Sequence, residues 1–401
     1  MRAKNFILLT LLAFMVAWIF VPTGGHGYDV YAFARWAVFI RQNGLGHAYE
    51  LPNLDYNPLY IELLWLFGRL QGTPAHIEST FFTFKLVVLA FDFAAAYLTA
   101  YMLKINGRNI FLACFVLFNL AYLYNTLFWG QVDSIFCFFI AFAIFLSVQD
   151  RLLASLVCLV LAVNFKLQAV VFIPLVLFLN FNAMRADKRR FLRVLPIVLG
   201  LQTLILLPFL NMTKLRAIIK VNQDQWRASS TLAPSGCNLW CLIHGEPAAS
   251  LPSATHVLGL PLRTWGVVLF ALAAAVVLVP VFRELVLKRR TLTHRHVFLA
   301  SSLYALTFFF FMTGMHERYS HPAVLFMGIF AVLSGSYFGL LAISVAYFLN
   351  LEIAFAYLHL NTYDTVIFKR GFIAAIFLIV LVTGTFKLYR ELFDPRIRPI
   401  A

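Results

Sequence analysis

Apolar stretches long enough to cross a lipid bilayer recur from one end of this chain to the other. A transmembrane helix needs about 20 mostly apolar residues to cross roughly 30 Å of hydrocarbon. Stretches near this length lie at 5–22, 82–103, 109–128, 133–149, 152–165, 167–181, 191–210, 264–282, 297–314, 322–337, 338–358 and 371–388. We therefore predict an all-α integral membrane protein with about twelve transmembrane helices.

The composition agrees with a membrane location. Of the 401 residues, 62% are hydrophobic and 12% are charged, whereas a soluble domain usually has about 25% charged residues. These values exclude a soluble globular protein. The formal net charge of +15 comes from Lys and Arg in short clusters between apolar stretches, which is typical of cytoplasmic loops and does not indicate nucleic-acid binding.

The basic clusters predict the orientation of the chain. When the stretches are threaded through the membrane, the clusters around Arg2, Lys104, 185–193, 283–295 and 387–398 fall on one side, which is then cytoplasmic. The opposite side receives a first outer loop, 23–81, and a long outer loop, 211–263. No internal repeat or separate soluble domain is evident, so residues 1–401 are interpreted as a single membrane domain, with stretch 5–22 retained as an anchor.

Asp29 is the first candidate for chemistry in the outer loops. The segment 28–41 has apolar residues at helical spacing, which predicts an amphipathic helix on the membrane surface. Asp29 falls in its first turn, where it could cap the helix. Alternatively, its carboxylate is a general base that accepts a proton from a sugar hydroxyl.

A second carboxylate lies further along the same loop. Asp55 precedes Pro58, and Pro58 begins a short apolar helix that is too short to cross the membrane. Asp55 is either a turn residue or a group that orients the acceptor in the same cavity as Asp29.

Polar residues also interrupt the apolar stretches. Asp133 lies in Trp129-Gly-Gln-Val-Asp, and Lys166 lies in a turn between two apolar helices. Polar groups at membrane depth are costly and usually line a cavity or pair with one another. Lys166 is therefore either the partner of Asp133 or a phosphate ligand, while Asp92 and Glu352 are expected to make helix-packing hydrogen bonds.

The segment Met315-His-Glu-Arg-Tyr-Ser-His321 gathers four ionisable groups in a short outer turn. Arg318 could bind a phosphate in a forked geometry, and His316 could donate to the same oxygen. The alternative is a cluster at the membrane interface that caps helix ends. No pair of histidines has metal-ligand spacing on a helix, so no metal site is predicted, although a divalent ion remains open.

Two cysteines lie in a polar loop, and several nucleotide-binding motifs are missing. Cys237 and Cys241 are spaced for a disulfide or for two unbonded thiols. The chain contains no Asp-x-Asp pair, no Walker A loop and no dinucleotide glycine motif. An activated sugar used on the outer side would therefore have to arrive on a membrane lipid.

Several short motifs occur in an order that resembles a known family. They are Gly27-Tyr-Asp29 with Arg35-Trp36, Leu54-Asp55-Tyr-Asn-Pro-Leu, Gly130-Gln-Val-Asp-Ser, Lys166-Leu-Gln168, Asn238-Leu-Trp-Cys241 and Met315-His-Glu-Arg-Tyr. Together they resemble the GT-C superfamily of polyprenyl-phosphate-sugar glycosyltransferases, especially the glucosyltransferases that extend the N-glycan precursor and their shorter bacterial relatives. The likeness runs over most of the chain, and each motif is short and moderately specific.

The resemblance implies a reaction and assigns roles to residues. The chain would move a sugar from a polyprenyl-phosphate donor to an acceptor hydroxyl on a glycolipid or glycan, with inversion and without a cofactor. Asp29 matches the family's catalytic carboxylate, and the turn His316-Glu317-Arg318 matches its turn near the donor phosphate. The expected donor-phosphate ligands are His316, Arg318 and Lys166, and the expected substrate-binding residues are Asp55, Arg35, Gln131, Asp133, Trp240 and Glu317.

Two departures from the family bear on location, and two other classes of function compete with this interpretation. The eukaryotic enzymes have more than about twelve spans and tend to read Asp-Tyr-Pro-Pro where this chain reads Asp-Tyr-Asn-Pro. Both departures favour a bacterial cytoplasmic-membrane enzyme whose site faces outward. The alternatives are a secondary transporter or lipid flippase, which commonly has an inverted repeat, and a non-catalytic membrane scaffold.

Overall fold

The computed structural model describes residues 2–227 and 230–393. Within this part the chain is almost wholly helical, and its only strands form one short hairpin. The chain divides into two compact units. Unit 1 comprises Met1–Leu98 and Asn125–Arg227, and unit 2 comprises Thr99–Tyr124 and Ala228–Ala401.

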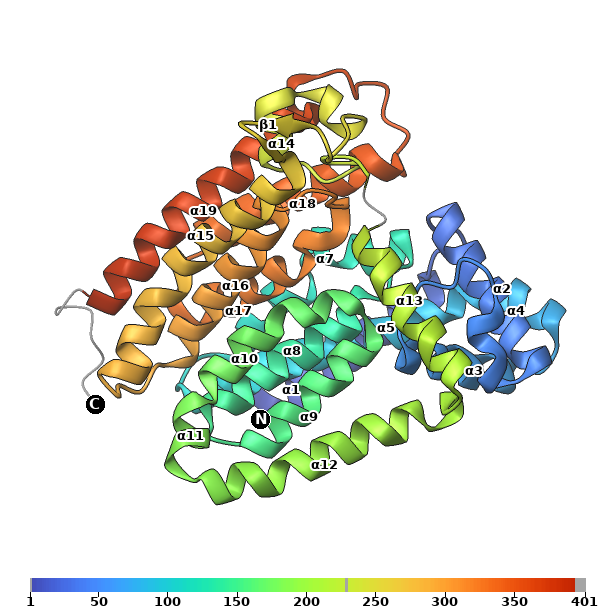
Figure 1. Cartoon of the computed structure of the whole chain (residues 1–401), viewed down its shortest axis with the longest axis horizontal. Helices are drawn as coiled ribbons and strands as arrows, with labels where there is room; N and C mark the ends of the chain where they lie inside the picture. The colour runs from blue at the N-terminus through green and yellow to red at the C-terminus, as the bar shows by residue number, and fades with distance from the viewer. Residues whose placement is uncertain (1, 228–229, 394–401) are drawn as a thin grey trace. The chain divides into compact units, whose positions relative to one another are not determined.

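Unit 1 contains residues 23–81, the predicted first outer loop, and a group of apolar helices (Figure 1). Its elements are α1 (Arg2–Phe20), α2 (Gly27–Asn43), η1 (Leu45–Glu50), α3 (Pro58–Gln71), α4 (Pro74–Thr80), η2 (Phe81–Thr83), α5 (Phe84–Ile105, whose end belongs to unit 2), the π-helical η4 (Tyr124–Trp129), α8 (Asp133–Val148), α9 (Leu152–Phe165), η5 (Leu167–Phe172), α10 (Ile173–Leu179), α11 (Phe181–Ala186), α12 (Lys188–Leu206), η6 (Leu207–Phe209) and α13 (Met212–Arg227).

Unit 2 contains the helices from Leu239 onward together with short helical segments between residues 110 and 123. Its elements are η3 (Ile110–Ala113), α6 (Cys114–Leu117), α7 (Leu120–Leu123), α14 (Leu239–His244), η7 (Glu246–Ala249), β1 (His256–Val257), β2 (Leu260–Pro261), α15 (Leu262–Phe282), the π-helical η8 (Arg283–Leu287), α16 (His294–Phe311), η9 (Glu317–Ser320), α17 (His321–Ser334), α18 (Phe338–Phe355), η10 (Val366–Phe368) and α19 (Arg370–Phe393). The two strands are antiparallel, and His256 pairs with Pro261.

The structure contains helices long and apolar enough to span a membrane, and the chain is an integral membrane protein. In the described residues there are six such helices, or seven if the bent pair Ile110–Leu117 and Leu120–Trp129 counts as one span. The predicted count of about twelve is not confirmed. The stretches at 133–149, 152–165 and 167–181 do form helices, but these are Asp133–Val148, Leu152–Phe165 and Leu167–Leu179, which are shorter than a typical span.

In the second half of the chain too, helix length and burial explain why fewer spans are found than predicted. The predicted span 322–337 is the helix α17 of 14 residues, and almost every residue of it is buried. A helix that is apolar on all sides is equally typical of a protein interior and of a membrane span. Hydropathy alone therefore cannot separate the two in this chain.

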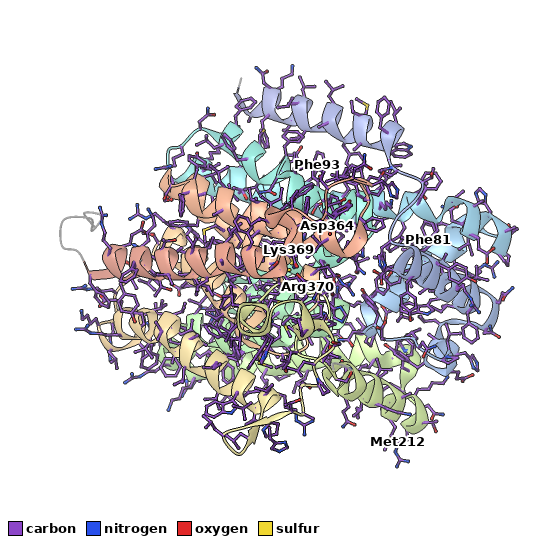
Figure 2. The ribbon with its side chains drawn as sticks, turned by 90° about the horizontal axis from the view of Figure 1, so that it is seen from above. Phe81, Phe93, Met212, Asp364, Lys369 and Arg370 are labelled. Atoms are coloured by element: carbon purple, nitrogen blue, oxygen red, sulfur yellow. The ribbon has the colours of Figure 1, made fainter. Side chains whose placement is uncertain are left out.

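Unit 1 is held together by aromatic and apolar side chains. On one side α1 packs on α5, where the Phe14 and Phe93 rings are 5.3 Å apart and Thr10 Oγ1 lies 2.5 Å from the Tyr97 hydroxyl. The side chain of Phe93 is labelled on α5 in Figure 2. The helix predicted at 28–41 is present as α2, and its buried face packs on α3.

Unit 2 is a bundle of long helices. The helix α16 lies at its centre and packs against α15, α17 and α19, which run beside it in Figure 1. Nearly every side chain of α16 is buried. The start of α19 carries Arg370, labelled in Figure 2, whose guanidinium donates to the carbonyl oxygens of Ala233 and Pro234. This contact attaches the loop before α14 to the bundle.

Candidate functional site

Asp29 is held in the first turn of α2 by two ring systems. Its Oδ2 accepts a hydrogen bond of 2.8 Å from Trp129 Nε1 and lies 3.1 Å from His26 Nδ1. The His26 ring stacks on Trp129 with centroids 4.6 Å apart. The residue that caps the helix is His26, not Asp29, and its side chain makes no capping bond. Helix capping therefore does not explain the contacts that hold the Asp29 carboxylate. Its negative charge is also stabilised by the positive end of the helix dipole.

A lysine joins the two loops that meet at Asp29. Lys85 is buried in α5, and its Nζ donates to the carbonyl oxygens of Pro22, at 2.9 Å, of Leu127, at 2.7 Å, and of Gly24. All three donors of an ammonium group are thereby used. The contact fixes the loop before α2 against the end of η4.

Two glycines allow these loops to approach one another. A Cβ at Gly25 would lie 2.6 Å from Val30 Cγ2 and 2.9 Å from the carbonyl oxygen of Trp129. Gly130 has φ +85°, a left-handed conformation that a glycine adopts without strain. The close approach permits the 2.9 Å bond from the His26 amide to the Trp129 carbonyl oxygen.

Asp55 lies in an extended segment before α3 and is exposed. It shares a neighbour with Asp29, since both carboxylates act on the buried phenol of Tyr60. Burial raises the pKa of Tyr60 well above its usual value, and the negative charges of Asp29 and Asp55 raise it further. The role predicted for Asp55, in the same cavity as Asp29, stays a prediction.

Arg35 lies on the exposed face of α2. Its guanidinium carbon is 5.5 Å from the centre of the Tyr31 ring, one helical turn earlier. Such a stack holds the side chain against its own helix. The substrate-binding role predicted for Arg35 stays a prediction.

Lys166 and Asp133 form a buried ion pair in unit 1. Lys166 Nζ donates to Asp133 Oδ1, and Asn125 Nδ2 donates to Asp133 Oδ2 at 3.1 Å. Nearby, the Tyr56 hydroxyl donates to Gln131 Oε1 at 3.0 Å, and its ring lies 5.5 Å from Lys166 Nζ. The structure shows Lys166 paired with Asp133, which is one of the two predicted alternatives. A role as phosphate ligand stays a prediction.

The turn at 315–321 forms a polar cluster in unit 2. Glu317 is buried and accepts a 2.7 Å hydrogen bond from Arg318 Nη1 and another from the hydroxyl of Ser235. His316 is more accessible, with 42% of its side chain exposed, and its Nδ1 lies 3.2 Å from Ser235 Oγ. The turn thus combines a shielded ion pair with one exposed imidazole.

The charge of Glu317 is matched inside the protein. Burial by itself would raise the pKa of Glu317, but the Arg318 guanidinium beside it, together with His316 and the Ser235 hydroxyl, holds that pKa well below its usual range. Glu317 is therefore ionised at neutral pH. Its contacts suit a residue that orients Arg318 better than one that binds a sugar directly.

The loop at 230–241 pairs with this turn along the backbone. The amide of Gly236 donates to the Met315 carbonyl oxygen at 2.8 Å, and the amide of Gly314 donates to the Leu232 carbonyl oxygen at 2.7 Å. Asn350 of α18 fixes both segments, because its Nδ2 donates to the Glu317 carbonyl oxygen and its Oδ1 accepts from the Cys237 amide. The loop therefore positions Ser235 beside Glu317.

Trp240 lies on the short helix α14 and is buried. Its Nε1 donates to the carbonyl oxygens of Phe311 and Met312 at the end of α16, at 3.2 and 3.3 Å. These bonds satisfy the last carbonyl groups of a helix, which have no partner within it. The substrate-binding role predicted for Trp240 stays a prediction.

Cys237 and Cys241 are unbonded thiols in the structure. Burial raises the pKa of both, so neither is a reactive thiolate at neutral pH. In residues 2–227 and 230–393, no group of three or more His, Cys, Asp or Glu side chains could hold a metal ion.

The sequence interpretation missed several residues of these sites. His26, Lys85, Ser235 and Asn350 were given no role. Lys85 and Asn350 stand inside apolar stretches, where a polar side chain is costly and usually has a specific partner. That signal could have identified both.

Comparison with known proteins adds no family to this description. No protein-family model matches the chain, and no curated protein sequence matches it. Any assignment of function consequently rests on the residues described above.

Proposed function

We propose that this chain is a membrane glycosyltransferase that moves a sugar from a polyprenyl-phosphate donor to an acceptor hydroxyl, with inversion. The observation that carries the proposal is the arrangement at Asp29. A carboxylate in a helix's first turn, 12% exposed and oriented by an indole and an imidazole, has the geometry of a general base held ready for a hydroxyl group.

The proposed reaction needs only acid–base chemistry and stabilisation of a leaving phosphate. The acceptor oxygen attacks the anomeric carbon while Asp29 takes the hydroxyl proton. The bond between the anomeric carbon and the phosphate oxygen breaks, and the polyprenyl phosphate leaves with the electron pair. Trp129 and His26 keep the carboxylate in one orientation, so that little reorganisation is needed during proton transfer.

The family resemblance is the basis for proposing that the turn at 315–321 binds the donor phosphate; the structure describes this turn and Asp29 within separate units. Arg318 and His316 are the cationic or hydrogen-bonding groups there, and Glu317 with Ser235 orients them. Guanidinium and imidazole donors stabilise charge on a leaving phosphate. Lys166 is left out of this role, because its side chain is 6% exposed and paired with Asp133, whereas Arg318, paired with Glu317, is 16% exposed.

The proposed membrane is the bacterial cytoplasmic membrane, with the reaction on its outer face. The acceptor is proposed to be a glycolipid or a lipid-linked glycan. The basic clusters at 185–193 and 283–295 support this orientation, since positively charged loops stay in the cytoplasm.

The test is sugar transfer by purified protein in lipid nanodiscs. The wild type and Asp29→Asn are incubated with radiolabelled polyprenyl-phosphate sugars and a bacterial lipid extract, and the labelled glycolipids are separated and counted. Loss of a general base typically slows a reaction by a factor of about 10² to 10⁴. Glu50→Gln, an exposed carboxylate of the same outer loop, serves as the matched control and should keep wild-type activity.

Two results would contradict the proposal. One is the absence of transfer by the wild type with every donor sugar offered. The other is transfer by Asp29→Asn at more than a tenth of the wild-type rate, which would remove Asp29 as the base.

A secondary transporter is the second candidate. The observation that favours it is the presence of ionisable residues inside apolar helices of unit 1, among them Asp92 on α5. Such residues often mark ion or substrate pathways. Uptake of labelled sugars or glycolipids into proteoliposomes under an ion gradient, without any transfer activity, would support the transporter over the glycosyltransferase.

A further inference from the structure

The turn of the β-hairpin in unit 2 holds a leucine in a strained conformation. The strands β1 and β2 pair Val257 with Leu260, so Leu258 and Gly259 form a two-residue turn. Both have positive φ, +51° for Leu258 and +80° for Gly259, as a type I′ turn requires. Glycine, asparagine and aspartate adopt this conformation with little strain, whereas a leucine adopts it at a cost. The local backbone energy therefore disfavours leucine at this position.

The side chains around this turn are apolar and exposed. Leu258 is 86% exposed, and Val257 and Leu260 are 43% and 41% exposed. Residues 256–262 include no Lys, Arg, Asp or Glu. Single exposed apolar side chains are common on proteins in water, but here three lie together on one small hairpin. Their free energy falls if an apolar phase covers them.

The hairpin lies against the first turn of α15, which is one of the helices able to span the membrane. Trp265 Nε1 donates a 2.9 Å hydrogen bond to the Val257 carbonyl oxygen, and the Leu262 amide donates to the Thr255 carbonyl oxygen at 2.8 Å. Figure 1 shows β1 at the end of unit 2 where α15 begins. These bonds hold Val257 beside the start of the span.

Trp265 is also the first residue of an apolar stripe along α15. It is followed, at spacings of three or four residues, by four exposed apolar side chains, those of Val268, Leu272, Val276 and Val279. An exposed apolar stripe on a membrane span faces lipid, and tryptophan is enriched where a span meets the water interface. The hairpin therefore lies on the lipid-facing side of α15, near the membrane surface.

We propose that the turn of this hairpin inserts into the lipid leaflet at which α15 begins, with Leu258 as the deepest residue. Contact of Val257, Leu258 and Leu260 with acyl chains offsets the strain of the turn. The edges of a two-stranded hairpin carry unpaired backbone groups, which are costly in hydrocarbon. The insertion therefore ends at the boundary between headgroups and acyl chains, and Ala254, at the base of the hairpin, stays in water.

The lipid contact would also fix the depth of a neighbouring segment. The Ser253 amide donates to the Ser230 carbonyl oxygen at 2.7 Å, and the Leu232 amide donates to the Leu251 carbonyl oxygen at 3.0 Å. These bonds join the hairpin region to the loop 230–241. The inserted turn therefore anchors this loop to the membrane surface, whether or not the chain transfers sugars and whichever side α15 begins on.

The test is fluorescence quenching in phosphatidylcholine nanodiscs. A bimane label is attached at Leu258→Cys, at Ala254→Cys on the exposed base of the hairpin, and at Leu272→Cys in the apolar stripe of α15. Phosphatidylcholine brominated on its acyl chains should quench the labels at 258 and 272, whereas iodide in the water should quench the label at 254. Quenching at 258 is expected to be about half of that at 272 or more, because an interfacial segment reaches the upper part of the acyl chains.

The variant Leu258→Asn separates insertion from hairpin structure. Asparagine tolerates a φ of +51°, so the hairpin should stay folded while its deepest apolar side chain is lost. A label at Leu260→Cys should then be quenched by brominated lipid about threefold less than it is with Leu258 present, because less apolar surface favours insertion. Leu258→Met keeps an apolar side chain and is the matched control, in which quenching at 260 should be unchanged.

The proposal is overturned if iodide quenches the label at 258 as strongly as the label at 254 and brominated lipid does not quench it. Unchanged lipid quenching at 260 in Leu258→Asn would overturn it too, because the position of the hairpin would then not depend on Leu258. Should the labelled Leu258→Cys protein fail to fold, the comparison at Leu260→Cys decides.

Discussion

The Trp129 indole donates a 2.8 Å hydrogen bond to the Asp29 carboxylate, and 100 residues of chain separate the two. The bond joins the first turn of α2 to the last residue of η4. Since the Lys85 ammonium holds the carbonyl groups on either side of this bond, the carboxylate is fixed by elements that are distant in sequence. The arrangement gives the proposed base one orientation.

Removing this hydrogen bond should slow sugar transfer. Trp129→Phe keeps an aromatic ring to stack on His26 but removes the indole donor. A hydrogen bond to a charged group contributes about 1.5–3 kcal/mol, so a decrease in kcat of about tenfold or more is expected, with little change in the donor KM. Trp18→Phe, an exposed tryptophan on α1, is the control. Equal kcat in both variants would mean that the indole does not orient the base.

Substitutions in the turn at 315–321 should have two kinds of effect, because His316 is exposed whereas Glu317 and Arg318 form an ion pair. His316→Ala removes an accessible side chain and should raise the donor KM or lower kcat while leaving the unfolding temperature nearly unchanged. Arg318→Ala leaves the buried Glu317 carboxylate without its partner and should destabilise the fold by about 3–5 kcal/mol, and Glu317→Gln, which leaves the half-buried Arg318 unpaired, should cost less. His316→Ala is therefore the cleaner test of phosphate binding. Full activity of a folded His316→Ala enzyme at limiting donor would show that this histidine is not a ligand.

The buried pair of Asp133 and Lys166 should behave non-additively. Lys166→Met leaves Asp133 charged and unpaired, which typically costs about 3–5 kcal/mol. The double variant Lys166→Met/Asp133→Asn buries no unpaired charge and should recover at least about 2 kcal/mol of that loss. The measurement is thermal unfolding followed with a thiol-reactive dye, since Cys137 and Cys158 are buried in the folded state. Simple addition of the two single effects would argue against a direct ion pair.

The sequence predicted the helical class and the surface helix of the first outer loop, because both depend on local patterns. Hydrophobic periodicity identified α2, and Pro58 marked the beginning of α3. The number of membrane spans was not predictable in the same way. Apolar helices such as α8, α9 and α17 have the composition of spans, and only their length and burial distinguish them.

The contacts within the candidate sites depend on distant parts of the chain. The sequence left two alternatives for Lys166, and the structure shows it paired with Asp133. The bonds from Trp129 to Asp29 and from Ser235 to Glu317 join residues that no local pattern connects. Their detection requires the tertiary fold.

Glu62 should make the stability of unit 1 depend on pH. It lies on α3, and burial raises its pKa from 4.5 to about 7. The folded state then binds the proton more tightly than the unfolded state, so stability is lost as pH rises from 4.5 to about 7 and is constant above that range. After discounting for solvent screening, the loss is about 1–2 kcal/mol. Glu62→Gln should remove it, so its unfolding temperature should exceed that of the wild type at pH 8 but not at pH 4.5. A constant difference across this range would exclude the titration of Glu62.

The proposed orientation predicts which loops an impermeant thiol reagent can reach in intact cells. Arg189 and Thr291 are exposed residues in the two largest basic clusters, and His256 is exposed in the hairpin of the long outer loop. Because positively charged loops are retained in the cytoplasm, Arg189→Cys and Thr291→Cys should be protected until the cells are permeabilised, whereas His256→Cys should react at once. The five native cysteines are buried or half-buried, so the unmodified protein is a suitable background. Labelling of Arg189→Cys and Thr291→Cys in intact cells, with protection of His256→Cys, would place the long outer loop in the cytoplasm.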